Sequence, residues 1–163
     1  MALPERSARI VLREFTAGDE VHFRRLNEEW ILRHFAMEPK DEQSLADPQG
    51  TILTGGGRIF FAVRGGEVVG CCALLAIGSG EFEVAKMAVT ESYQGLGIGR
   101  RLLAKAISEA RASGATRLCL ETNRKLVAAI RLYESLGFEH IPPERVEASP
   151  YARSNVSMEM NLD

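Results

Sequence analysis

The stretch Gln94-Gly95-Leu96-Gly97-Ile98-Gly99-Arg100-Arg101 is the most informative part of this chain. Its three glycines at alternate positions separate a strand-like segment, Phe82–Val89, from a strongly helical one, Arg101–Ala112. A glycine-rich turn that opens a helix leaves several backbone N–H groups unpaired, and the helix dipole adds positive potential at the same point. Because glycine has no side chain to block an approaching anion, the turn suits a phosphate or pyrophosphate.

The segments around this turn indicate a mixed α/β protein with a single domain over residues 1–163. Helical spacing predicts helices at Glu20–Phe35, broken into two, at Arg101–Ala112 and at Leu126–Leu136. The polar segment Glu38–Thr54 predicts a loop or short helix, and the glycines at 55–57 a flexible link. Alternating apolar residues and turn signals predict strands at Arg9–Phe15, Arg58–Arg64, Glu67–Ile77, Glu81–Val89, Thr116–Glu121, Phe138–Ile141 and Asn155–Leu162. This order predicts an antiparallel meander followed by strand–helix–strand.

The composition excludes several classes of function. The 163 residues are 45% apolar and carry a net charge of −2 with scattered basic residues, so we expect a buried core and no nucleic-acid partner. No apolar run approaches the ~20 residues that cross a bilayer, and Met1–Arg6 has no signal-peptide core. Three cysteines without a C-x-x-C pair argue against a disulfide framework and a zinc site. We expect a cytoplasmic protein without membrane or metal, with Cys71, Cys72 and Cys119 as small buried hydrophobes.

Two common phosphate-binding motifs do not match the glycine turn. A dinucleotide fold requires G-x-G-x-x-G after the first strand, whereas here the third glycine comes one position early and three or more strands precede it. A P-loop requires G-x-x-x-x-G-K-[ST], which the chain lacks. Taken alone, the turn is either an anion site or an ordinary tight connection between a strand and a helix.

The segments that flank the turn resemble the GCN5-related N-acetyltransferase (GNAT) superfamily. The matching pieces are Glu83–Val89, then Tyr93–Gly99 with the [QR]-x-x-G-x-[GA] signature at Gln94, Gly97 and Gly99, then Ala129–Phe138. The resemblance implies a central mixed sheet of six to seven strands with an antiparallel N-terminal meander and about four helices. It also implies a parallel strand pair, Phe82–Val89 and Thr116–Glu121, that splays at the cofactor site.

The resemblance implies acetyl-CoA as the co-substrate. Its pyrophosphate would bind the backbone N–H groups of the turn, which agrees with the argument from the glycines alone. Its pantetheine arm would pair with the preceding strand end as an added β-strand. Arg100, Arg101 and Arg131 are candidates for the 3′-phosphate, although each is also an ordinary helix-surface arginine. The implied cofactor contacts are Met87, Ala88, Val89, Gln94, Gly95, Leu96, Gly97, Ile98, Gly99, Arg100, Asn123, Ala129 and Tyr133.

Acetyl transfer to an amine requires a base for the amine and an acid for the leaving thiolate. Glu83 matches the position of the family's catalytic glutamate, and strand alternation puts it on one face with Ala85 and Met87. A carboxylate beside an apolar cleft has a raised pKa, which suits a base that works directly or through a water. The alternative is a strand-edge glutamate paired with Lys86 or an arginine, and Glu81 is a weaker rival for the same role.

Tyr133 matches the tyrosine of the family's A-x-x-L-Y-x-x-x-G-F pattern, which implies the acid that faces the CoA sulfur. The alternative is a core tyrosine. The chain departs from the pattern at Leu126, where many members have a pantetheine-binding asparagine. Asn123 either replaces that contact or caps the following helix.

The acceptor is expected to be a small molecule, either an amine or an amino acid. In the family, the acceptor site lies between the early helices and the loop before the last strand, here 27–42 and 144–154. Acidic and aromatic residues in these segments suit a cationic amine, whereas Arg33, Arg145 and Arg153 suit an acceptor carboxylate. A protein N-acetyltransferase and a non-catalytic acyl-CoA-binding module stay open as alternatives, and so does a homodimer.

Overall fold

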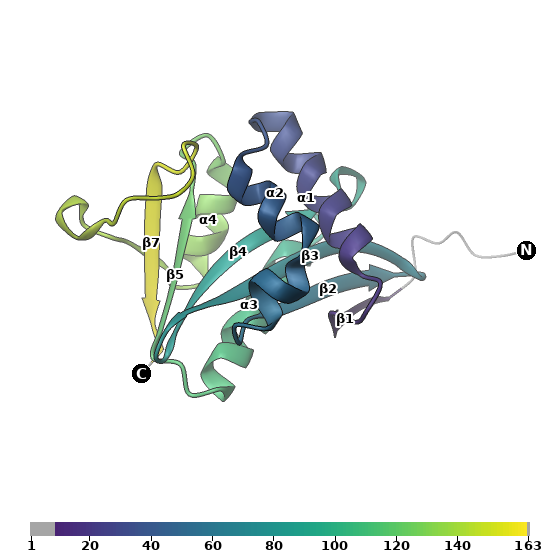
Figure 1. Cartoon of the computed structure of the whole chain (residues 1–163), viewed down its shortest axis with the longest axis horizontal. Helices are drawn as coiled ribbons and strands as arrows, with labels where there is room; N and C mark the ends of the chain where they lie inside the picture. The colour runs from purple at the N-terminus through teal and green to yellow at the C-terminus, as the bar shows by residue number, and fades with distance from the viewer. Residues whose placement is uncertain (1–8, 163) are drawn as a thin grey trace, which may run out of the picture.

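A computed structural model of the chain describes residues 9–162 as one seven-stranded sheet with helices on both faces (Figure 1). Residues 1–8, where the sequence lacks a signal-peptide core, lie outside the described residues. The spatial order of the strands is β1-β2-β3-β4-β5-β7-β6, and only the β4–β5 pair is parallel within the described sheet. The strands are β1 (Ile10–Glu14), β2 (Arg58–Arg64), β3 (Glu67–Gly78), β4 (Glu81–Val89), β5 (Arg117–Thr122), β6 (Glu139–His140) and β7 (Val156–Asn161).

The first helix, α1 (Glu20–His34), is continuous, so the predicted break into two helices is wrong. Val21, an apolar residue in its first turn, is 66% exposed, whereas the buried face carries Phe23 and the polar Asn27. Asn27 is compatible with this face because its amide donates to Phe23 O (2.9 Å) and its Oδ1 accepts from the Trp30 indole (3.1 Å). Because the hydrogen bonds of Asn27 are made within the helix, this polar residue can lie on the buried face. The apolar pattern in the sequence is therefore interrupted although the buried face of the helix is continuous.

A second helix, α2 (Pro39–Ala46), lies in the segment predicted as a loop or short helix. Its N-terminus has a proline in the first turn and a capping box between Glu38 and Asp41. A short π-helical turn, Gln49–Leu53, follows. After it, Gly57 N donates a hydrogen bond to Ile52 O at 2.9 Å. The glycines at 55–57 therefore form a hydrogen-bonded turn, not the flexible link that we predicted.

The two remaining α-helices agree with the sequence apart from their bounds. Helix α3 (Ile98–Ala112) begins three residues earlier than predicted, directly after the glycine turn, and α4 (Val127–Ser135) lies within the predicted range. Short 3-10 turns occupy Glu91–Tyr93 and Pro143–Arg145. None of the helices within residues 9–162 has the length and apolar character needed to cross a bilayer.

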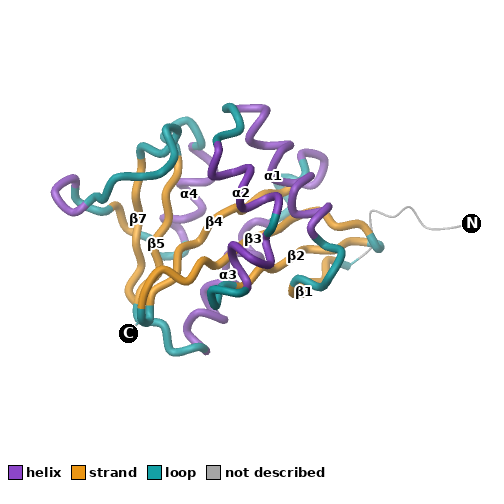
Figure 2. Tube along the Cα trace, in the orientation of Figure 1, coloured by secondary structure: helices purple, strands orange, loops and turns teal. Residues whose placement is uncertain are grey.

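The sheet separates two apolar cores. Strand alternation sends Phe60 and Ala62 of β2 to the side of α3 and α4, and Ile59 and Phe61 to the side of α1 and α2. Figures 1 and 2 show α1 and α2 in front of the sheet and α3 behind it. Leu102 belongs to the core behind the sheet. Both faces of the central strands are thus buried, as the apolar runs of β2 and β3 require.

Strands β4 and β5 pair over a short distance only and then separate. Their parallel register runs from Glu81 opposite Arg117 to Val84 opposite Leu120, after which β4 stays with β3 and β5 with β7. Lys86 has a φ of 52°, and the β3–β4 register shifts beside it, which marks a β-bulge. A bulge bends its strand, and Figure 1 shows β4 leaning away from β5. This confirms the predicted splayed parallel pair.

The tight connection before β2 gives a test of this packing. A Cβ added at Gly57 would lie 2.5 Å from Leu74 O and 2.7 Å from Ile52 O, both backbone atoms. We expect Gly57→Ala to lower the free energy of unfolding by roughly 1–3 kcal/mol, because the backbone must shift to admit the methyl group. Gly55→Ala is the matched control, since its Cβ would meet only Ile52 O at 3.9 Å. Urea unfolding followed by circular dichroism measures both, and equal effects would contradict the crowding argument.

Candidate active site

The separation of β4 from β5 opens a cleft of about 770 Å³ through the sheet. Because the opening interrupts the sheet itself, side chains from both faces of the sheet line the cleft. It is lined from the α1–α2 side by Trp30, Phe35, Lys40, Gln43 and Ser44, and from α4 by Ala129 and Tyr133. The loop before β7, residues 141–155, covers one end of it. Most predicted catalytic and acceptor-site residues therefore meet at one place.

Glu83 lies on β4 just before the strands separate, opposite Cys119 of β5. Its neighbour Val84 belongs to the core behind the sheet, so Glu83 faces the α1–α2 side and lines the cleft. Burial, together with the negative charge of Glu121, raises the pKa of Glu83 to about 7, against the opposing effect of Lys40 and Lys86. No hydrogen bond or ion pair joins Glu83 to another described residue, so the alternative of a paired strand-edge glutamate is wrong.

The rival carboxylate, Glu81, is engaged elsewhere. Its Oε1 lies 3.7 Å from Arg117 Nη1 at the closed end of the β4–β5 pair, although it still touches the cleft. Glu83 is therefore the glutamate of β4 that is half-buried beside the opening and left without a partner among residues 9–162. An unpartnered carboxyl group with a pKa near neutrality is what a general base requires.

Glu121 is a site residue that no sequence motif marks. It shares a cleft-facing side of β5 with Arg117 and Cys119, and it raises the pKa of Glu83. Ser149 Oγ donates to Glu121 Oε2 at 2.6 Å, which ties the covering loop to β5. The signal that was available is the alternation of Arg117, Cys119 and Glu121 along one side of the strand.

Tyr133 enters the cleft from α4, on the opposite side of the sheet from Glu83. Its side chain is 8% exposed and packs edge-on against Phe138, with 6.1 Å between ring centroids. Burial raises the pKa of the phenol, so it stays protonated at neutral pH. Its hydroxyl has no hydrogen-bond partner within the described chain. The core-tyrosine and functional interpretations are compatible, since the ring is buried while the residue lines the cleft.

The glycine turn has the conformation of an anion site. Gly95 and Gly97 have φ angles of 78° and 79°, and Gly97 is the N-cap of α3. An added Cβ would meet nothing within 4 Å at either position, so the left-handed backbone angle is what requires glycine there. The first helical hydrogen bond of α3 runs from Arg101 N to Gly97 O at 3.1 Å. The three preceding amides, at 98–100, are therefore left for an anion.

The remaining predicted cofactor contacts surround these two features. Gln94 Nε2 donates to Val89 O at 3.0 Å and holds the turn against the end of β4. Met87 and Ala129 line the cleft, while the Ala88 side chain is buried under α1. Arg100 donates to Ser135 Oγ at 2.7 Å, beside the turn, whereas Arg101 reaches Ile10 O of β1.

Asn123 lies at the edge of the cleft with both ends of its side chain engaged. Its Nδ2 donates to Arg153 O (2.7 Å) and its Oδ1 accepts from Lys125 N (2.9 Å). It does not cap α4, whose N-cap is Leu126, so the capping alternative is wrong. Asn123 instead fastens the loop before β7 to the end of β5.

A buried charge cluster forms the wall opposite α4. Asp41 of α2 is fully buried and accepts from Lys86 Nζ (2.5 Å), from both terminal nitrogens of Arg153 (2.6 Å each) and from Glu38 N (2.9 Å). Burial by itself would raise the pKa of Asp41, but these hydrogen bonds lower it to about 2. The Arg153 guanidinium also lies over the Tyr151 ring, 4.5 Å from its centroid. The cluster joins α2, the bulge of β4 and the covering loop.

The other two arginines proposed for an acceptor carboxylate are also paired. Arg33 bonds Glu91, and Arg145 bonds Glu159, which also accepts from Arg117 Nε at 3.0 Å. With Arg153 held by Asp41, none of the three is left for an acceptor without breaking a salt bridge within the protein.

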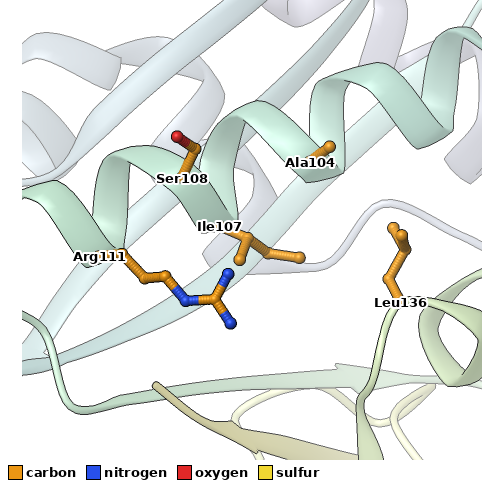
Figure 3. A pocket seen from close by; sticks show the side chains of 5 residues that line it. All are labelled: Ala104, Ile107, Ser108, Arg111 and Leu136. Carbon is orange, nitrogen blue, oxygen red and sulfur yellow. The ribbon is translucent and has the colours of Figure 1, made fainter. Parts of the chain in front are cut away.

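Sites outside the cleft carry little chemistry. A hollow of about 270 Å³ between α3 and the end of α4 is lined by Ala104, Ile107, Ser108, Arg111 and Leu136 (Figure 3). It has no carboxylate, imidazole or thiol. No group of three or more metal-ligating side chains occurs in residues 9–162. Cys71 is buried with a pKa raised to about 12, and Cys119, half-buried in the cleft, has one raised to about 11, so neither is a reactive thiolate.

Comparison with known proteins identifies the family. The model of the "Acetyltransferase (GNAT) family" matches residues 22–138. An IAA acetyltransferase of Azospirillum brasilense is 37% identical over 123 residues, covering 75% of this chain and 77% of that protein. The N-alpha-acetyltransferase RimI of Mycobacterium tuberculosis is 39% identical over 83 residues, covering 49% of this chain and 51% of that protein.

Solved structures share the fold. A GNAT-family acetyltransferase from Staphylococcus aureus Mu50 superposes with a TM-score of 0.87 at 21% identity, over 95% of this chain and 100% of the other. The structure of yncA from Salmonella typhimurium with its cofactor acetyl-CoA gives a TM-score of 0.74 at 23% identity, over 96% and 95%. The family model, the curated relatives and the splayed sheet agree. This chain therefore belongs to the GNAT family, and it is an acetyl-CoA-dependent N-acetyltransferase.

Proposed function

We propose that this protein transfers the acetyl group of acetyl-CoA directly to the amine of a small molecule, with Glu83 as the base and Tyr133 as the acid. One observation carries the proposal: Glu83 and Tyr133 enter the same cleft from opposite faces of the sheet, where β4 loses its strand partner. The reacting thioester and amine would be held between a proton acceptor and a proton donor. Such positioning is a large part of enzymatic acyl transfer.

Two features of the structure support the binding of acetyl-CoA, the acetyl donor. The amides at the start of α3 suit the pyrophosphate, because they are unpaired and lie at the positive end of the helix dipole. Beyond Val84, the edge of β4 that faces away from β3 has no strand partner in the described chain, so it can pair with the amides of the pantetheine arm. Both features point toward the cleft that contains Glu83 and Tyr133.

The proton transfers follow from the two environments. Glu83 accepts a proton from the amine, whose nitrogen forms a bond to the acetyl carbon as the carbon–sulfur bond breaks. A carboxyl with a pKa of about 7 is sufficiently basic for this and still ionised at slightly alkaline pH. Tyr133 is neutral, because burial raises its pKa, and its proton is donated toward the departing sulfur.

Removal of the base tests the first role. We expect Glu83→Gln to lower kcat/KM for amine acetylation by about a hundredfold or more, a typical contribution of a general base. In the wild type, kcat/KM should fall as the pH drops below about 7, because Glu83 then becomes protonated. Release of free CoA thiol against pH measures both, with Glu81→Gln as the matched control on the same strand. A Glu83→Gln variant with wild-type activity contradicts the assignment.

Removal of the phenol tests the second role. Tyr133→Phe keeps the ring that packs on Phe138, so we expect a stable protein with kcat lowered by about tenfold to a hundredfold and little change in KM for acetyl-CoA. Steady-state thiol release measures both constants. If thiol release is unaffected in both Glu83→Gln and Tyr133→Phe, the assignment of these two residues fails. A non-catalytic binding module is favoured only if the wild type binds acetyl-CoA and releases no thiol with any amine.

The raised pKa of Glu83 also predicts a stability cost. Its pKa is about 7 in the folded protein against an ordinary 4.5, so the folded state holds a proton that the unfolded state has lost between these values. The cost is absent below about pH 4.5, grows through this window and is complete above pH 7. We expect Glu83→Gln to raise the free energy of unfolding by roughly 1–3 kcal/mol at pH 8 and to change it little at pH 4. Urea unfolding at both pH values checks the sign.

A further inference from the structure

The cleft contains carboxylates without ion partners and cations that are already neutralised. Glu83 and Glu121 both line it, and neither forms a salt bridge with another described residue. Glu121 accepts only the neutral hydroxyl of Ser149. By contrast, Lys86 and Arg153 are both bonded to Asp41, and Arg153 also to Glu38. The paired cations therefore leave these two carboxylates as uncompensated negative charge at the cleft surface, against one exposed lysine, Lys40.

Asp41 is the residue that produces this imbalance. Its carboxylate accepts hydrogen bonds from both terminal nitrogens of Arg153 at 2.6 Å, so that edge of the guanidinium cannot form a bidentate contact with another carboxylate. The flat faces of the same group lie near aromatic rings, 4.5 Å from the Tyr151 centroid and 5.6 Å from that of Trp30. Arg153 is therefore held in the cleft wall, and its positive charge is compensated by Asp41 and Glu38.

We propose that the acceptor is an amine that carries no carboxylate beside the reacting nitrogen, and that Glu121 and Asp41 set this specificity. This inference rests on the proposed function. Glu121 attracts an ammonium group and repels an anion next to Glu83, while Asp41 keeps Lys86 and Arg153 from attracting one. Lys40, at the α2 wall, is the one cleft-lining cation that forms no ion pair among residues 9–162. It is exposed, and a single exposed lysine offers an anion little affinity.

Matched pairs of acceptors isolate the carboxylate. Each pair is an amino acid and the amine that remains when its carboxyl group is removed: alanine and ethylamine, phenylalanine and 2-phenylethylamine, tryptophan and tryptamine. We expect kcat/KM for the amine to exceed that for its amino acid by at least about tenfold, equivalent to about 1.4 kcal/mol. Equal values, or a preference for the amino acids, overturn the inference. If no member of any pair releases thiol, the proposed function itself fails, so the two failures are distinguishable.

Variants test the two residues through the amine-to-amino-acid ratio, which a general loss of activity does not change. Glu121→Gln removes the repelling charge, and we expect the ratio to fall by about fivefold to tenfold. Asp41→Asn removes the ion partner of Lys86 and leaves Arg153 with Glu38 alone, so it should lower the ratio further. Arg153→Met is the matched control, because it removes one cation and leaves Lys86 paired with Asp41, so it should not lower the ratio. An unchanged ratio in Glu121→Gln contradicts its assigned role.

Asp41→Asn leaves the buried Lys86 without a counter-charge and Arg153 with Glu38 alone, so it is the variant most at risk of unfolding. Glu121→Gln keeps the inference falsifiable in that case, since Glu121 lies on the cleft surface with a single hydroxyl partner. Lys40→Gln covers the opposite outcome. If amino acids are preferred in the wild type and this variant abolishes the preference, then Lys40 binds the carboxylate and the inference is wrong.

Discussion

The early end of pairing between β4 and β5 is the constraint on which the rest of the site depends. Beyond Val84 and Leu120 the two strands follow different partners, and the sheet has a gap where its middle would be. A gap in a sheet exposes unpaired backbone groups and interrupts a core, so it must be supported from outside. Here the supports are the bulge at Lys86, the burial of Tyr133 and the loop that covers the cleft.

The charge cluster around Asp41 provides much of that support. It fixes the bulge through Lys86, the covering loop through Arg153 and the start of α2 through Glu38. A buried ion network contributes little net stability compared with apolar packing, because desolvation offsets the attraction. Its value here lies in geometry and charge: it brings three segments that are distant in sequence to one wall and compensates the charges of Lys86 and Arg153.

Glu83 illustrates the opposite treatment of a charge. It is half-buried beside another carboxylate and receives no hydrogen bond from the described chain, which raises its pKa and destabilises the ionised folded state. Asp41, equally acidic in sequence, is held ionised by two cations. Two carboxylates, one lining the cleft and one buried in its wall, thus differ in their basicity because of their surroundings, as is common where one group must exchange protons and the other must not.

The sequence by itself determined the glycine turn, the bounds of β2 and β4, the mixed sheet and the positions of Glu83 and Tyr133, because these depend on local backbone preferences and on motifs at fixed spacing. It misjudged α1, where the buried Asn27 hides the apolar face, and it gave no pairing for Asp41, Lys86 and Arg153. Such contacts join residues more than 40 positions apart, and no local pattern encodes them. Only the tertiary structure decided which charges in the cleft are cancelled and which remain, because that depends on which distant side chains the fold brings within hydrogen-bond distance.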